Sequence, residues 1–87
     1  YRIGAGEVEA ALLAHPAVTE AAVVGEPDPD LGQRIVAYVV AADAVAADLE
    51  AFVATALSVH KRPRRIVFLD SLPRNALGKV QKSLLTP

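Results

Sequence analysis

Apolar residues near the start of the chain follow helical spacing. Within residues 5–15 (AGEVEAALLAH), Val8 and Leu12 share one face, and acidic side chains favour the N-terminal turn of a helix. Pro16 disfavours helical geometry at the residue before it. The pattern therefore predicts a helix over residues 5–15 that ends at the proline.

Two extended segments follow this helix. Residues 19–25 (TEAAVVG) predict a strand, and residues 34–41 (RIVAYVVA) are rich in the β-branched and aromatic residues typical of a second strand. Between them, residues 26–32 (EPDPDLG) contain prolines, aspartates and a glycine, which are typical of a turn. Because the connection is short, we expect the two strands to pair as an antiparallel hairpin.

The second half of the chain predicts a helix, a strand and a further helix. Residues 46–58 carry apolar side chains at helical spacing, namely Leu49, Phe52, Val53 and Leu57. Residues 66–69 (IVFL) predict a short third strand, and residues 80–85 a short terminal helix. The order helix–strand–strand–helix–strand–helix indicates an α/β fold of the α+β type, with a small three-stranded mixed sheet and flanking helices.

Length and composition restrict the class of protein. The 87 residues are enough for one small domain, residues 1–87, and the start at Tyr1 in a structured-looking segment suggests a piece of a longer chain. Cysteine is absent, which fits a cytoplasmic protein. No apolar run is long enough to span a bilayer, and Arg2, Glu7 and Glu9 interrupt any signal-peptide core.

Charge is unevenly distributed although the net charge is only −1. Acidic residues dominate before residue 51. After it, the bases are Lys61, Arg62, Arg64, Arg65, Arg74, Lys79 and Lys82, against Asp70 alone. The C-terminal segment is therefore locally cationic and could attract an anionic ligand, although composition alone favours an ordinary solvated surface.

The stretch PRNALGK, residues 73–79, has the outline of a phosphate-binding loop. A true P-loop begins with glycine and carries Ser or Thr after its lysine. Here Pro73, which has no N–H for an amide cradle, stands in place of the glycine, and Val80 stands in place of the hydroxyl residue. These two departures exclude a P-loop.

What this stretch retains is Lys79 on an exposed loop, directly after Gly78. Glycine permits positive φ or entry of the backbone into a tight space. An ammonium is a compact point charge suited to a carboxylate or phosphate oxygen. Two interpretations stay open: a lysine inserted into another surface, or a solvated lysine in an ordinary turn.

A second cationic cluster, HKRPRR, places Lys61, Arg62, Arg64 and Arg65 around Pro63. Such a cluster can bind phosphate groups, because the arginine fork matches phosphate oxygens. A solvated basic turn and a weak nucleic-acid patch are the alternatives. Aromatic residues are scarce, which argues against a stacking platform for single-stranded nucleic acid.

The remaining residues form no catalytic or metal motif that the sequence can identify. His15 and His60 lack ligand-like spacing and are predicted to be surface or structural residues, so no metal site is expected. No Ser-His-Asp arrangement is apparent. Phe52 and Phe68 fall on core-facing positions. The chain therefore does not resemble a complete enzyme.

Three separated motifs in order resemble the C-terminal domain of adenylate-forming enzymes. They are YRIGAGEVEAAL, HKRPRRIVFLDSLP and PRNALGKVQK, and together they cover nearly the whole chain. That superfamily includes acyl-CoA synthetases, the adenylation domains of peptide synthetases, and luciferases. The basic cluster and the ending are most similar to acyl-CoA synthetases, of the malonyl-CoA synthetase type.

The resemblance implies a reaction in two steps. A carboxylate attacks the α-phosphate of ATP to give an acyl-adenylate, and the thiol of coenzyme A then attacks the adenylate. A large N-terminal domain, the partner of this chain, would hold most of the ATP and acid pocket together with Mg²⁺. The small domain would rotate as a lid, presenting Lys79 in the first step and the face near Tyr1 and Arg2, beside the pantetheine channel, in the second.

The resemblance also implies roles for individual residues. Arg2 would contact the nucleotide or the thiol channel, and Glu9 would support the structure of the lid. The phosphates of coenzyme A would meet the basic cluster, which includes Lys61, Arg62 and Arg64. Gly78 would let Lys79 approach the reacting groups.

Residues 73–79 also match the P-x-x-x-x-G-K pattern seen around a lysine that is reversibly acylated in this family. Acetylation removes the charge of a lysine. We therefore expect Lys79 to be a substrate of a GNAT-type lysine acetyltransferase and of a deacylase that reverses the modification. The isolated chain should have no ligase activity of its own.

Two alternatives remain at this stage. The chain could be the lid of an adenylation domain that charges a carrier protein, in which case a docking surface would replace the coenzyme A contacts. It could also be a non-catalytic binding module that uses its basic half for nucleic acid. The leading interpretation, an acyl-CoA synthetase lid, includes neither a nucleic-acid nor a membrane partner.

Overall fold

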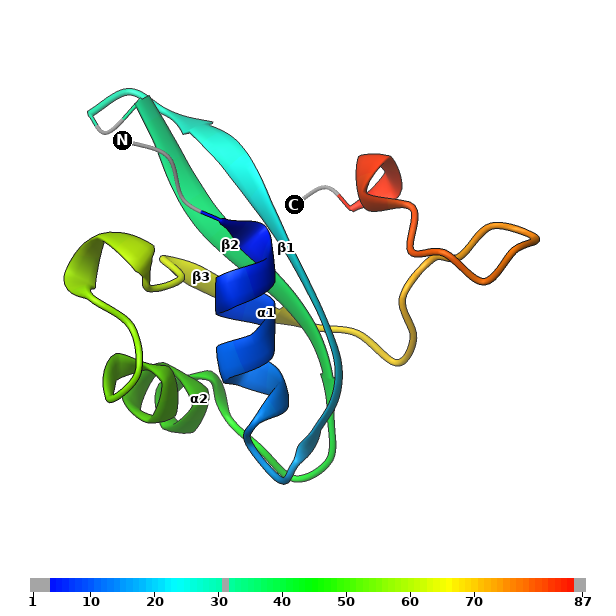
Figure 1. The fold of residues 1–87 in the computed structure, drawn as a ribbon, viewed down its shortest axis with the longest axis horizontal. Helices are drawn as coiled ribbons and strands as arrows, with labels where there is room; N and C mark the ends of the chain where they lie inside the picture. Colours follow the sequence, from blue (N-terminus) through cyan, green and yellow to red (C-terminus); the bar gives the residue numbers. More distant parts are fainter. Residues whose placement is uncertain (1–3, 31, 86–87) are drawn as a thin grey trace.

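The computed structural model describes residues 4–30 and 32–85. Its elements in chain order are α1 (Ala5–Leu13), β1 (Val18–Asp28), β2 (Gly32–Ala41), α2 (Ala46–Ala54), the 3₁₀ helix η1 (Val59–Lys61), β3 (Arg65–Phe68) and the 3₁₀ helix η2 (Lys82–Leu84) (Figure 1). Strand β2 lies at the centre of the sheet, antiparallel to β1 and parallel to β3. The predicted α+β fold with a three-stranded mixed sheet is confirmed.

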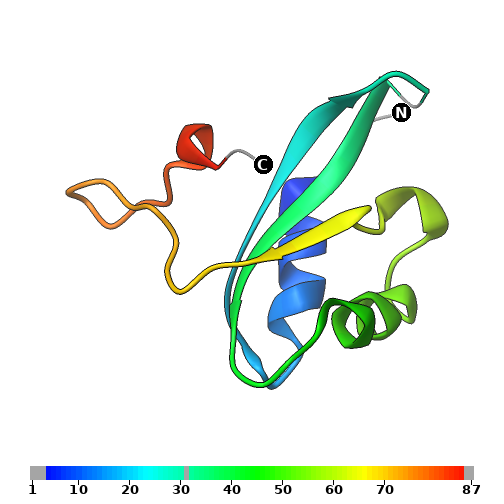
Figure 2. The same ribbon diagram turned by 180° about the vertical axis from the view of Figure 1, so that it is seen from behind.

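The sheet is covered on both faces, and side-chain alternation along β2 determines which residues face which layer. Ile35, Ala37 and Val39 pack with buried residues of α1 and α2 in one cluster. Val36 and Tyr38 point the other way and pack with Leu72 and Leu85. These two residues belong to the segment that follows β3, residues 69–85, which is the C-terminal segment of the fold. Figures 1 and 2 show the two helices on one side of the sheet and this segment on the other. Burial from both sides explains why β2 is continuously apolar in its middle.

The hairpin of β1 and β2 is longer than its sequence predicts. Part of the predicted turn, Glu26 to Asp28, continues β1 and pairs with β2 as far as Gly32. Pro27 is tolerated because β1 is an edge strand, where a missing N–H need not break the ladder. The turn itself is short, and the Asp28 carboxylate accepts a 2.9 Å hydrogen bond from the N–H of Asp30.

The second helix ends earlier than predicted, at Ala54 instead of residue 58. The Thr55 hydroxyl donates a 2.7 Å hydrogen bond to the carbonyl of Phe52, which satisfies a group of the last turn. The Arg62 guanidinium donates to the carbonyls of Ala54 and Leu57 at 3.1 Å and 2.9 Å. These bonds satisfy carbonyls that further helical turns would otherwise use.

The predicted terminal helix over residues 80–85 is only a three-residue 3₁₀ turn. Val80 is held extended by an antiparallel bridge with Arg74, and Gln81 donates its N–H to the carbonyl of Pro73 at 2.8 Å. The backbone bonds of residues 80 and 81 are therefore committed to the loop before them, and too few residues remain for an α-helix.

The predicted core positions are mostly buried, with one error. Leu49, Val53 and Leu57 belong to the core, and Phe52 packs against it. Phe68, predicted to face the core, is 39% exposed because β3 is the other edge strand of the sheet. None of the helices in the described ranges is long and apolar enough to cross a membrane.

We expect the core around α2 to limit the stability of this small domain. Leu49 is fully buried, so Leu49→Ala should lower the free energy of unfolding by about 2–5 kcal/mol, from lost burial and the cavity left behind. Leu13→Ala is the matched control, since Leu13 ends α1 and is 47% exposed. Urea denaturation of both variants, followed by circular dichroism, checks this. Equal losses in the two variants would contradict the assignment of the core.

Candidate functional site

The Gly-Lys loop, residues 74–80, is a small closed hairpin. Its ends are joined by the antiparallel bridge between Arg74 and Val80. Gly78 donates its N–H to the carbonyl of Asn75 at 2.9 Å and has a φ of +83°. Because side chains strongly disfavour that φ, glycine lets the chain turn back here directly before Lys79.

Asn75 organises the interior of this loop. Its side-chain oxygen accepts hydrogen bonds from the N–H groups of Leu77 and Lys79 at 2.9 Å and 3.0 Å. Its own N–H donates to the carbonyl of Lys79 at 2.9 Å. Both backbone groups of Lys79 are thus bonded to a single residue, which restricts the directions in which its side chain can leave the loop.

The side chain of Lys79 itself is unconstrained. Lys79 is exposed, and among the described residues its ammonium has no partner. Its neighbour Leu77 is 87% exposed. Figures 1 and 2 show the loop, coloured orange, extending from the side of the sheet that lies away from the helices. A fixed backbone with a free, unpaired cation is an arrangement that can deliver charge to a second surface.

Fewer side chains of the basic cluster, residues 61–65, are available to bind a phosphate than the sequence indicates. The Lys61 ammonium contacts both carboxylate oxygens of Glu7, on α1, at 2.9 Å and 3.2 Å. Arg62 is partly buried and donates to backbone carbonyls at the end of α2. Two of the predicted phosphate-binding residues therefore already hold the domain together.

Among the predicted phosphate-binding residues Lys61, Arg62 and Arg64, the side chain of Arg64 is the one that is still available to a ligand. Its N–H donates to the carbonyl of Ile35 at 2.8 Å, which anchors its backbone beside β2. Its side chain is exposed and has no protein partner in the part of the chain that the structure describes. Arg65, the first residue of β3, is exposed as well.

Glu9 connects three elements. One of its carboxylate oxygens accepts a 2.8 Å hydrogen bond from the N–H of Val23, on edge strand β1, and lies 2.7 Å from the ammonium of Lys82 on η2. The contact ties the helical layer to the C-terminal segment around the edge of the sheet. Tyr1 and Arg2, the other predicted site residues, lie outside the described residues.

His15 has a structural position. Its Nδ1 accepts a 3.0 Å hydrogen bond from the N–H of Ala17, and its ring packs edge-on against Phe52 at 4.8 Å between centroids. No group of three or more His, Asp or Glu side chains that could hold a metal ion occurs among residues 4–30 and 32–85.

A buried polar group lies on the sheet face that the C-terminal segment covers. Burial, and next the nearby Glu26 carboxylate, raise the pKa of the Tyr38 hydroxyl above its ordinary value, so this phenol is neutral at physiological pH. Glu26 pairs with Arg34 at 3.2 Å. Within the described ranges, the Tyr38 hydroxyl, one Glu26 oxygen and the Arg34 Nε are buried without hydrogen-bond partners.

Sequence reasoning missed the residues that support the Gly-Lys loop. Asn75 could have been found, because asparagine commonly bonds the backbone two residues on in turns. The contact of Arg74 with Glu20 could not, since the two residues are 54 positions apart and the pairing depends on how the C-terminal segment crosses the sheet.

A small α+β domain whose cationic loop has a fixed backbone can place a positive charge against a surface outside the domain. Residues 7–79 match the family of AMP-binding enzyme C-terminal domains, and the chain belongs to that family. The predicted resemblance is thereby confirmed. An acetyl-coenzyme A synthetase of Rubrobacter xylanophilus is 44% identical over 91 residues, which cover 98% of this chain and 14% of that protein.

Solved structures agree with the family. A fatty acyl-CoA synthetase of Mycobacterium tuberculosis superposes with a TM-score of 0.92 at 30% identity, covering 97% of this chain and 17% of that one. A malonyl-CoA ligase, in a complex with methylmalonyl-CoA and AMP, gives a TM-score of 0.76 at 58% identity, covering 85% and 17%. The chain thus spans a small fraction of the length of these relatives.

We expect Glu9 to stabilise the domain through the edge of the sheet. Glu9→Ala leaves the N–H of buried Val23 without its acceptor, so the free energy of unfolding should fall by about 1–2 kcal/mol. Glu50→Ala is the control, because Glu50 is exposed on α2 and its loss should change stability by less than about 0.5 kcal/mol.

Urea denaturation measures both variants, and Glu9→Gln separates the two contacts. Glutamine retains an acceptor for Val23 but loses the charge that faces Lys82. It should therefore recover most of the stability. Losses of the same size in Glu9→Ala and Glu50→Ala would show that the Glu9 contacts do not support the fold.

Proposed function

We propose that this chain is the C-terminal lid of a longer, ATP-dependent acyl-CoA synthetase. In the first step a carboxylate oxygen attacks the α-phosphorus of ATP, and pyrophosphate leaves to give an acyl-adenylate. In the second step the thiol sulfur of coenzyme A attacks the acyl carbon, and AMP leaves. Family membership and the coenzyme A synthetases among the relatives support this reaction over the charging of a carrier protein.

Lys79 supplies the positive charge of the first step. The attacking carboxylate and the α-phosphate are both anionic and repel each other, so a cation aimed between them stabilises the charge that accumulates in the transition state. The observation that carries this assignment is the Gly-Lys loop itself: bonded backbone, exposed side chain, and no competing anion on the ammonium within the described residues. Little reorganisation is then required when the lid closes.

The second step uses another surface of the lid. Coenzyme A carries several phosphates, and among Lys61, Arg62 and Arg64 the side chain of Arg64 is the one without a protein partner in the described part of the chain. We therefore assign the principal phosphate contact to Arg64, with Tyr1 and Arg2 beside the thiol channel. Rotation of the lid exchanges these residues for Lys79 between the steps.

The other half of the active site belongs to the N-terminal domain that this function requires. That domain binds most of the ATP, the Mg²⁺ that accompanies it, and the acid. A chain without cysteine suits a reducing compartment, and we assign the enzyme to the cytoplasm.

Lys79 is also the proposed site of reversible acetylation. Its ammonium is exposed, and Leu77, two residues earlier, offers an enzyme an exposed apolar contact. A GNAT-type acetyltransferase would transfer the acetyl group of acetyl-CoA to Nζ, releasing coenzyme A, and a deacylase would hydrolyse the amide. The modification removes the charge on which adenylate formation depends.

In the full-length enzyme, Lys79→Ala should lower adenylate formation by roughly two to three orders of magnitude, because a cation aimed at the transition state is lost. Thiol transfer from preformed acyl-adenylate should survive. Pyrophosphate exchange measures the first step, and release of AMP the second. Lys82→Ala is the control, since Lys82 is the next lysine along the chain and faces Glu9. Equal loss in both steps would contradict this role of Lys79.

Acetylation should map to Lys79 alone. Incubation of the full-length enzyme with a GNAT-type acetyltransferase and acetyl-CoA, followed by mass spectrometry, identifies the modified residue. Adenylate formation should fall in proportion to occupancy and recover after treatment with a deacylase. Lys79→Arg should abolish labelling, whereas label at Lys61 or Lys82 in place of Lys79 would exclude the proposed site.

A further inference from the structure

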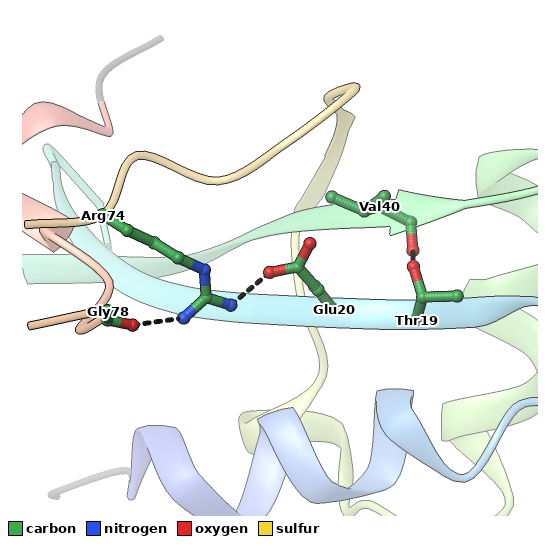
Figure 3. Close-up of polar contacts among 5 residues, drawn as sticks. All are labelled: Thr19, Glu20, Val40, Arg74 and Gly78. Carbon is green, nitrogen blue, oxygen red and sulfur yellow. Dashed lines mark hydrogen bonds and ion pairs between the residues drawn. The ribbon is translucent and has the colours of Figure 1, made fainter.

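Arg74 connects the Gly-Lys loop to the sheet. Its Nη1 donates a 2.7 Å hydrogen bond to the carbonyl of Gly78, inside the loop, and its Nη2 bonds the carboxylate of Glu20 on β1. Figure 3 shows the guanidinium between these two acceptors. A planar fork with separate donors suits this bridging geometry, because each acceptor meets its own nitrogen.

The bond to Gly78 acts on the peptide unit that precedes Lys79. The carbonyl of this unit accepts from Arg74, and its N–H, which belongs to Lys79, donates to Asn75 at 3.0 Å. The unit is therefore held at both ends. Because Gly78 has a φ of +83° and glycine tolerates many other conformations, the unit could otherwise rotate and redirect the lysine.

The bond to Glu20 connects the loop to strand β1 of the sheet. Glu20 lies in β1 opposite Val40 of β2, where the register shifts between Val18 and Glu20. The neighbouring Thr19 hydroxyl donates to the carbonyl of Val40 at 3.0 Å, which reinforces the pairing at this point (Figure 3). The orientation of the loop is thus set relative to the sheet as well as within itself.

The Arg74–Glu20 contact is a weak candidate for a stabilising interaction. The side chains are 44% and 30% exposed, so solvent screens the pair and its contribution to the free energy of unfolding is small. The pair has a more specific effect on the position of Lys79. This effect matters because catalysis by a charged group depends steeply on where that group lies.

We propose that Arg74 and Glu20 are positioning residues for the Lys79 ammonium during adenylate formation. The proposal rests on the function proposed above. Arg74 holds the Gly78–Lys79 peptide unit in the orientation that aims the lysine out of the loop, and Glu20 holds Arg74. Neither residue touches the reacting atoms.

The test uses the full-length enzyme and both half-reactions. Arg74→Ala should lower the kcat of adenylate formation about 10- to 100-fold, because a lysine that is free to point elsewhere is rarely in place. KM for ATP and thiol transfer from preformed acyl-adenylate should stay within about twofold of the wild-type values. Arg74→Lys should be intermediate, since one ammonium replaces a two-nitrogen fork.

Variants at position 20 separate positioning from simple pairing. Glu20→Gln keeps an acceptor for Arg74 and should lower kcat less than Arg74→Ala does. The double variant Glu20→Arg/Arg74→Glu restores an ion pair but turns a carboxylate toward the Gly78 carbonyl, so it should remain as impaired as Arg74→Ala. Glu50→Gln, which changes an exposed acid on α2, is the control.

Three outcomes would overturn the proposal. Wild-type adenylate formation in Arg74→Ala, when Lys79→Ala is inactive, would exclude a positioning role while leaving the function of Lys79 intact. Parallel loss in both half-reactions, with a lowered melting temperature, would make the contact structural. Full activity in the double variant would show that the ion pair alone matters. An active Lys79→Ala would instead refute the proposed function itself.

Discussion

Burial of β2 on both faces is the constraint on which the rest of the structure depends. A three-stranded sheet with one face in water would leave Val36 and Tyr38 exposed, and a chain of this length has little apolar surface to spare. The helices cover one face, so the C-terminal segment has to cover the other. Leu72 and Leu85 do so from the two ends of that segment. The Gly-Lys loop lies between these two residues and projects from the sheet.

This division explains how the backbone of Lys79 can have a defined position while its side chain stays free to move. The residues that flank the loop are fixed by core packing, and the loop closes on itself through Asn75. The side chain of Lys79 remains in solvent. A cation in solvent retains its hydration until it enters another surface, and there the anionic groups of a substrate replace the water it loses. A lysine buried within its own domain would need a local partner and could not serve elsewhere.

The sequence was sufficient for the architecture and for the position of the lysine, but not for its surroundings. Helical spacing at Val8 and Leu12 and the β-rich run 34–41 are local signals, and both led to correct elements. The extension of β1 through Pro27 depends on its being an edge strand, which no local signal reveals. The link between Arg74 and Glu20 depends on tertiary packing in the same way. The resemblance to a family located Lys79, whereas the structure was needed to see what holds its loop.

The basic cluster illustrates why charge density in a sequence overstates available charge. Four cations within residues 61–65 suggest a phosphate site, yet Lys61 is bonded to Glu7 and Arg62 to the carbonyls that end α2. Both contacts stabilise the turn between α2 and β3. Arg64 emerges from a backbone anchored to Ile35, with its side chain free among the described residues. The same principle holds at both candidate surfaces of the domain: neighbouring residues immobilise the backbone, and at least one exposed cation has no ion-pair partner among the described residues. An unpaired cation on a fixed backbone meets a phosphate without further ordering of that backbone, so a domain too small to enclose a ligand can still place a charge against it.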